Sequence, residues 1–244
     1  MSSRAPFPRS RTLSTVARAA LAGLGLLAAQ AGWAATVDWA AWTSTTPSTV
    51  SGTLMVGSTA VGVTYSGAQY SFAQTNGSGT NFFVPTAPYL SATVANAPSA
   101  TDIVGLSDAG TSTITFSQAV VNPLIALVSW NGAVVTFGGG ADTQAYNVQY
   151  LSSGCGYWGC GSFTSTTSDS FDGSGELHGV IELLGTYTSI SFTDTTNEGW
   201  HGLTVGVEGG LASTVPEPAG NVTLLAGLLA LGLCARRRMG GSGR

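Results

Sequence analysis

The chain has 244 residues and a formal net charge of −4 at pH 7, and all 8 of its basic residues lie at the two ends, because no Lys or Arg occurs between Arg18 and Arg236. That interval holds all 12 acidic residues, so residues 35–216 carry a formal charge of about −11. A middle without cations disfavours binding to nucleic acid or anionic lipid and excludes Lys and Arg salt bridges, so burial and backbone pairing must stabilise the fold.

The N-terminal segment has the pattern of a secretory signal peptide. Residues 1–18 contain four arginines and no acidic residue, and an apolar run at 19–31 follows them. Gly32 and Ala34 then supply the small residues of a cleavage site, so we predict a signal peptide at 1–34 that is removed during export. The apolar run is shorter than the ~20 residues of a spanning helix, which disfavours a retained anchor. The expected partners are the Sec export machinery and signal peptidase.

Residues 35–212 have the texture of an all-β domain. Short runs rich in Val and Thr alternate with Gly, Asn, Ser and Pro, and long amphipathic helical patterns are absent. The spacing predicts an antiparallel two-sheet sandwich of jelly-roll type, with a closed barrel or a solenoid as alternatives. The strands are expected at 50–56, 60–65, 82–84, 111–117, 123–130, 133–137, 145–150, 180–184, 189–193 and 202–207.

Two of these strands are nearly continuous apolar runs. The runs at 123–130 and 180–184 are typical of central strands that are covered on both faces. Asn131-Gly132 follows the first run and predicts a hairpin to 133–137. Gly185-Thr186 similarly separates the second run from the strand that follows it.

Two cysteines enclose a short glycine-containing loop. Cys155 and Cys160 are five positions apart, and in an exported chain this spacing favours a disulfide over a metal site, which would need further Cys or His ligands nearby. Tyr157 and Trp158 lie between them and are candidate glycan contacts, because their rings can stack on sugars. The other tryptophans are interpreted as core residues: Trp39, Trp42, Trp130 and Trp200.

The acidic residues offer one local candidate for calcium. Asp169, Asp172 and Glu176 place three carboxylates and a Gly turn within eight residues. An EF-hand register would put Ser168 at the first ligand position, so the segment does not fit that loop. A solvated acidic surface is the favoured interpretation, so we predict no metal site and no cofactor, with calcium as the alternative.

The only two histidines have acidic neighbours. His178 lies near Glu176, and His201 lies near Glu198. Parts of a Ser/His/Asp hydrolase are therefore present, but no Gly-x-Ser-x-Gly motif positions a serine. We interpret both histidines as structural and predict no catalytic residue.

The C-terminal segment has three parts in a fixed order. Val215, Pro216, Glu217 and Pro218 precede an apolar stretch, and three arginines follow it: Arg236, Arg237 and Arg238. The arginines should stay cytoplasmic and leave the domain outside. We therefore predict a transmembrane helix at about 220–235.

This tail resembles the PEP-CTERM sorting signal, which has the same Pro-Glu-Pro, short apolar helix and arginine cluster. The resemblance covers about the last 30 residues, taken here as 213–244. It implies a Gram-negative source that makes exopolysaccharide, and cleavage by an exosortase near Pro-Glu-Pro. Residues 197–207 also resemble the closing strands of many PEP-CTERM exported domains, which implies a related fold but no reaction.

The sequence therefore predicts an exported, exosortase-sorted, non-enzymatic protein of the cell surface or extracellular matrix that associates with exopolysaccharide. An inner-membrane intermediate, anchored by the C-terminal helix, is expected on the route. The alternatives are a carbohydrate-binding module assisted by calcium and an extracellular hydrolase with a divided site.

Overall fold

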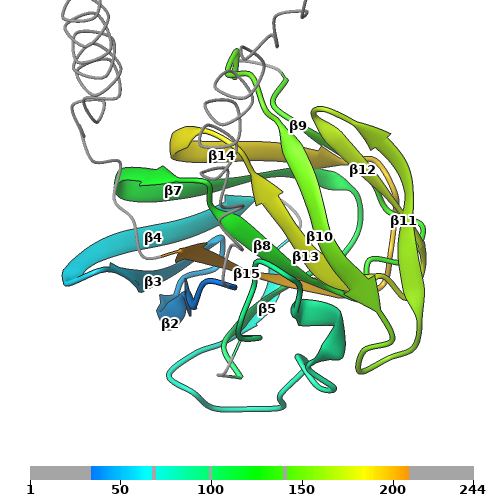
Figure 1. Ribbon diagram of the computed structural model, residues 1–244, viewed down its shortest axis with the longest axis horizontal. Coiled ribbons are helices and arrows are strands. Elements are labelled where there is room, and N and C mark those ends of the chain that lie inside the picture. The colour runs from blue at the N-terminus through cyan, green and yellow to red at the C-terminus, as the bar shows by residue number, and fades with distance from the viewer. Residues whose placement is uncertain (1–33, 68–69, 99–100, 140–141, 209–244) are drawn as a thin grey trace, which may run out of the picture.

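The computed structural model describes residues 34–67, 70–98, 101–139 and 142–208 (Figure 1). These residues form β-strands and one short 3-10 helix, η1 (Ala87–Tyr89). The predicted signal peptide, apart from Ala34, and the predicted sorting tail lie outside the described residues. Across the described ranges, no helix combines the length and the apolar character that crossing a membrane requires.

The first sheet is antiparallel and has the order β10-β13-β8-β15-β6-β5, with β1 paired to β15. Its central strand β8 has β13 and β15 as hydrogen-bonded neighbours. The strands are β1 (Val37–Trp39), β5 (Tyr70–Gln74), β6 (Ile103–Leu106), β8 (Leu124–Val128), β10 (Val148–Gly154), β13 (His178–Leu183) and β15 (His201–Glu208).

The second sheet is also antiparallel and has the order β11-β12-β9-β14-β7-β4-β3-β2. The two sheets pack face to face, so the predicted all-β antiparallel sandwich is confirmed. The strands are β2 (Ala41–Thr45), β3 (Thr49–Val56), β4 (Thr59–Gly67), β7 (Gly110–Val121), β9 (Val134–Phe137), β11 (Gly161–Thr167), β12 (Ser170–Gly175) and β14 (Thr186–Asp194).

Apolar side chains form two clusters, one on each face of the first sheet. The larger cluster fills the space between the sheets, where Trp42, Trp130 and Phe192 are buried. The smaller one includes Phe83 and Tyr89 and packs the segment around η1 against the outer face of the first sheet. Every residue of β8 is consequently buried, as the apolar run predicted. Burial on both faces is also seen in β13, apart from one half-buried residue.

The predicted hairpin at Asn131-Gly132 is wrong. The turn leaves β8 in the first sheet and enters β9 in the second, where β9 pairs with β12 and β14. The chain between β13 and β14 also changes sheet at Gly185. An Asn-Gly pair favours a local reversal of the chain, but β8 already has antiparallel partners on both edges. The turns at Asn131-Gly132 and Gly185 therefore connect strands of different sheets.

The strand positions agree with the sequence only in part. Residues 82–84 are not a strand, and the strand expected at 145–150 begins at Val148 and continues to Gly154. The short or Ser- and Gly-rich strands β1, β2, β5, β6, β11 and β12 were not predicted. Their weak apolar alternation explains this, because tertiary pairing rather than local pattern stabilises such strands.

Candidate functional site

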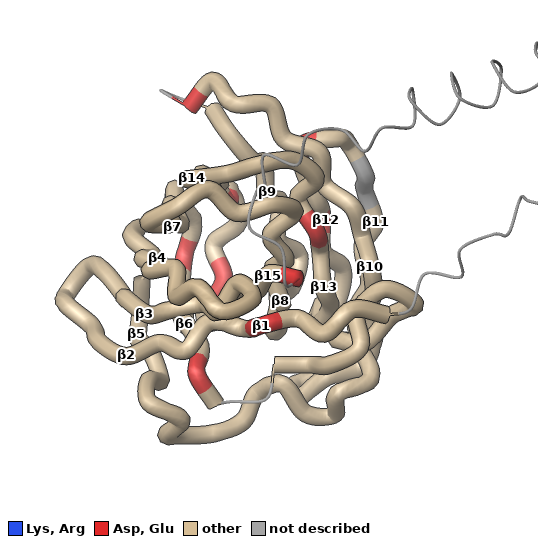
Figure 2. The backbone as a smooth tube through the Cα atoms, turned by 60° about the vertical axis from the view of Figure 1, so that its left-hand side comes forward, with Lys and Arg blue, Asp and Glu red and all other residues tan. Residues whose placement is uncertain are grey.

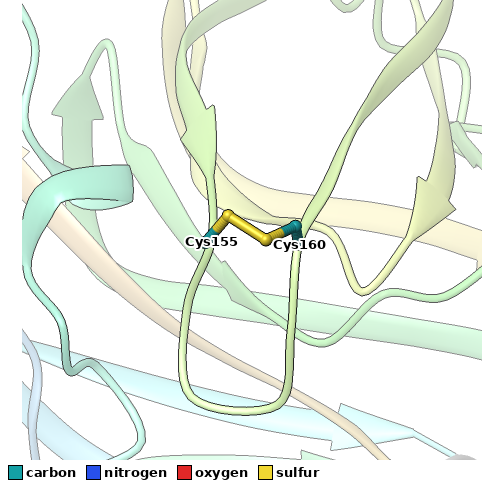
Figure 3. Close-up of a disulfide and its surroundings, with 2 residues drawn as sticks. All are labelled: Cys155 and Cys160. Carbon is teal, nitrogen blue, oxygen red and sulfur yellow. A yellow bond between two sulfur atoms is a disulfide. The ribbon is translucent and has the colours of Figure 1, made fainter.

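The predicted disulfide between Cys155 and Cys160 is confirmed (Figure 3). It joins the end of β10 to the start of β11, and the Gly156 N–H donates to the Gly159 carbonyl at 2.8 Å across the turn. A Cβ on Gly156 would lie 2.2 Å from Cγ of His178, so the turn packs against buried side chains only because this position is glycine. The two intervening aromatic residues are thereby held on a short, anchored loop.

Five aromatic side chains from four separate segments meet around this loop and form what we call the aromatic patch: Phe72, Phe82, Tyr157, Trp158 and Trp200. Phe82 is at its centre. The Phe82 ring centroid lies 5.2 Å from that of Tyr157 and 5.0 Å from that of Trp200. The Trp158 ring is within 24° of parallel to Phe82 at 6.3 Å. The patch is therefore a continuous array of packed rings.

The outer edge of the aromatic patch is open to solvent. Trp158 is 54% exposed and Tyr157 is 43% exposed, although they are among the largest apolar side chains of the loop. Exposed aromatic rings that touch one another mark interaction surfaces more often than isolated ones do. Rings that present a flat apolar face with a polar edge can stack on the C–H faces of sugars.

The sequence predicted only part of the aromatic patch. Tyr157 and Trp158 were expected to be available to a ligand, whereas Trp200 was assigned to the core and is in fact half-buried beside Trp158. Phe82 was assigned to a strand and lies instead in the loop before η1, with Phe83 buried beneath it. The adjacent aromatic residues Phe82 and Phe83 were the signal available in the sequence. The core assignment holds for Trp42 and Trp130, which are buried.

The surroundings of the patch carry no positive charge from Lys or Arg. Figure 2 shows acidic residues on several strands and no Lys or Arg along the described part of the chain. Glu176 lies next to the disulfide loop, where its Cγ is 3.0 Å from the Cβ position of Gly159. Anionic ligands would therefore meet repulsion rather than a counter-charge.

The calcium candidates do not converge. Asp169 precedes β12 and Glu176 follows it, so the length of the strand separates them by roughly 20 Å. The Asp169 carboxylate accepts a hydrogen bond from Thr167, and the Glu176 carboxylate accepts hydrogen bonds from Ser129 and Asn131. Asp172 lies between them within β12. In the described ranges, no three Cys, His, Asp or Glu side chains form a group that could hold a metal ion.

His178 is completely buried under η1. Its Nδ1 atom lies 3.0 Å from the Tyr89 hydroxyl, and burial lowers the pKa of His178 to about 4. Burial also raises the pKa of Tyr89 well above its ordinary value, so the phenol keeps its proton and shares a hydrogen bond with the neutral imidazole. The pair fastens the η1 segment to β13, which is a structural role.

His201 belongs to a second buried cluster that joins the two sheets. Its Nδ1 is 3.4 Å from the Glu198 carboxylate, and its Nε2 is 3.8 Å from Asp194 at the end of β14. The Trp130 ring covers it, with centroids 4.3 Å apart. Glu198 also accepts the Asn131 N–H at 2.9 Å. The polar groups are therefore closed in by aromatic and backbone atoms.

This cluster contains the residue types of a hydrolase but not their arrangement. The Ser129 hydroxyl donates to Glu176 and is buried at the end of β8. A nucleophilic serine needs an adjacent general base and access to substrate. His201 is 0% exposed, so a substrate carbonyl has no approach to it. The contacts within this cluster hold the ends of β8, β14 and β15 together.

The buried groups predict a stability maximum near pH 6.5. Burial lowers the pKa of His178 and His201 from 6.5 to about 4, so their contribution is complete above pH 6.5 and is lost as the pH falls toward 4. Burial raises the pKa of Glu198 from 4.5 to about 8, and the nearby Glu176 and Asp194 also raise it, whereas the hydrogen bond from Asn131 lowers it. Its contribution is complete below pH 4.5 and is lost as the pH rises through 8.

Urea unfolding between pH 4 and 9 measures this profile. Glu198→Gln removes the titrating group and is expected to flatten the decline between pH 6.5 and 8. Asp169→Asn, at an exposed carboxylate, is the control and should leave the decline unchanged. A Glu198→Gln chain that loses stability over this interval as the unmodified chain does would contradict the assignment.

Comparisons of this chain with protein-family models, with curated proteins and with solved structures found no match. Its function is therefore argued from its own residues.

Proposed function

We propose that this chain is an exported, exosortase-sorted, non-enzymatic protein of the cell surface or extracellular matrix, and that its β-sandwich associates with exopolysaccharide through the aromatic patch. The observation that carries the proposal is the exposure of Trp158 and Tyr157 on a disulfide-closed loop, next to Phe82 and Trp200. The domain thus acts as a carbohydrate-binding module within a surface protein. Calcium assistance is not part of the proposal, because Asp169, Asp172 and Glu176 do not converge.

The two ends of the sequence supply the route. A signal peptide at 1–34 and a PEP-CTERM tail at 213–244 direct export, membrane insertion through the helix at about 220–235, and cleavage by exosortase. The Cys155–Cys160 disulfide supports a location outside the cytoplasm, where such bonds persist. A jelly-roll-like connectivity is also part of the proposal, supported by the change of sheet between β6 and β7, β8 and β9, β10 and β11, and β13 and β14.

The proposal includes no catalytic activity because of the state of the two histidines. Both are completely buried and both have pKa values lowered to about 4, so neither is placed to exchange protons with a bound substrate. Ser129 is engaged with Glu176. A hydrolase would require the histidines and Ser129 to become accessible together. The aromatic patch consists of other side chains.

Trp158→Ala tests the proposal. Removal of the most exposed ring is expected to weaken polysaccharide binding about 30-fold, as loss of an aromatic residue that anchors a ligand typically costs ~2 kcal/mol. Met55→Ala removes a side chain of similar exposure, 44%, on β3 and should bind normally. Affinity electrophoresis in gels containing purified exopolysaccharide of the host measures both, with and without chelator. Equal retardation of the two variants would contradict the role of the patch.

A further inference from the structure

A polar groove of about 500 Å³ lies on the outer face of the second sheet. Its floor is formed by hydroxyl side chains of two neighbouring strands, Thr111 and Thr113 of β7 and Ser191 and Thr193 of β14. The strands are in register, so Thr111 faces Thr193, with their Oγ1 atoms 2.9 Å apart, and Thr113 faces Ser191. The alternate residues of β7, such as Ile114, are buried in the inter-sheet core, which turns these hydroxyls outward.

The far wall of the groove is anchored to the same strands. Gly138 N–H donates to the Ser191 carbonyl at 2.8 Å, and Tyr146 O–H donates to Oδ2 of Asp142 at 2.6 Å. The Tyr146 oxygen also accepts the Ser191 N–H at 2.9 Å, and the Gln144 N–H donates to Oδ1 of Asp142 at 2.9 Å. Both carboxylate oxygens of Asp142 are thus held in place, and each retains a lone pair for another donor.

The chemistry of the lining restricts the ligand. The described residues around the groove include no Lys or Arg, which disfavours phosphates and acidic sugars, and no aromatic ring lines it, which disfavours flat bases and apolar ligands. Hydroxyls and the Gln144 amide both donate and accept hydrogen bonds, and Asp142 accepts them. A volume of about 500 Å³ suits a short oligomer of a small polar unit.

We propose that this groove is a second ligand site that binds a neutral oligosaccharide. A neutral sugar carries closely spaced hydroxyls that both donate and accept hydrogen bonds, which matches two adjacent rows of Ser and Thr facing a fixed carboxylate. The site is separate from the aromatic patch, because the groove side chains of β7 and β14 face outward from the second sheet, whereas Phe82 packs against the apolar cluster on the outer face of the first sheet. If the proposed function of the patch also holds, one domain contacts polysaccharide on two sides and cross-links it.

The test uses the full chain carrying Trp158→Ala, so that binding through the patch is already weakened. Isothermal titration calorimetry is performed with neutral hexasaccharides of glucose, mannose, galactose and xylose, and with trigalacturonic acid as the anionic probe. At least one neutral hexasaccharide is expected to bind. Adding Thr113→Val and Gln144→Ala is expected to weaken that binding about 30-fold, since each of the two lost hydrogen bonds costs ~1 kcal/mol.

The control is Thr115→Val, which changes the next outward residue of the same strand, outside the lining of the groove. It should leave the affinity unchanged, and Val for Thr conserves shape and strand preference. No neutral hexasaccharide binding in the Trp158→Ala chain, equal affinity with and without the groove substitutions, or equal binding of trigalacturonic acid would each overturn the groove proposal. A different result would reject only the function proposed for the patch. In that result the groove still binds a neutral hexasaccharide, and Trp158→Ala leaves exopolysaccharide binding intact.

Discussion

Removal of residues 215–244 is expected to shift the β-sandwich almost completely from the membrane and surface fractions into the soluble periplasm or medium of its host. The segment 222–235 is the longest uncharged apolar stretch of the tail, and its helix would bury Leu and Ala side chains in lipid while Arg236–Arg238 stay at the cytoplasmic headgroups. If the proposed signal peptide is removed, residues 35–214 contain no apolar run of comparable length. Immunoblots of separated fractions measure the shift.

A second variant separates sorting from anchoring. Pro216→Ala with Glu217→Ala leaves the apolar helix and the arginines intact, so the chain should still insert but should not be processed. Mass spectrometry is expected to find an intact C-terminus in the inner membrane for this variant and a shortened one in the unmodified protein. Unchanged membrane retention after deletion of 215–244, or processing of the Pro-Glu variant, would reject the sorting proposal.

Trp130→Ala is expected to lower the free energy of unfolding by about 3–5 kcal/mol, as for other buried aromatic residues. Trp130 is 1% exposed and packs between Phe171, Phe192 and His201. Its Nε1–H also donates to the Gly202 carbonyl at 2.8 Å, so truncation leaves both a cavity and a buried acceptor without its donor. Denaturant unfolding followed by far-UV circular dichroism measures the change.

Trp158→Ala provides the matched control, because it removes the same side chain from the exposed patch. Its effect on stability is expected to stay within about 0.5 kcal/mol, as is usual for surface substitutions. Trp130→Phe should recover most of the packing and lose mainly the hydrogen bond to Gly202. Similar destabilisation by Trp130→Ala and Trp158→Ala would show that the burial of these two residues does not differ as described.

The fold class followed from local pattern, whereas strand pairing did not. The apolar runs that became β8 and β13 predicted strands buried on both faces, and the Ile114 and Phe116 alternation predicted the inward face of β7. The prediction of a hairpin at Asn131-Gly132 was wrong, because an Asn-Gly pair indicates only that the chain reverses its direction over a few residues. It does not indicate which strands have unpaired edges. The partners of β8 come from residues about 55 and 78 positions further along the sequence.

The candidate site was likewise predicted only in part. Cysteine spacing identified the disulfide and the exposed loop that it closes, and the distribution of Arg along the chain established the acidic middle. The contribution of Phe82 and Trp200 was not predicted, because these residues come from segments far apart in sequence. The clustering of His201 with Asp194 and Glu198, and the complete burial of His201, could likewise not be predicted from their spacing in the sequence.

The all-β class, the disulfide and the acidic, Lys-free middle could be predicted without a structure, because each depends on residue type or on neighbours a few positions apart. The tertiary structure alone decided which strands share a sheet, which tryptophans are covered, and which aromatic and hydroxyl side chains form common surfaces. Those properties depend on contacts between distant segments, and such contacts form only when burial of the whole core offsets the entropy of closing the long loops between them.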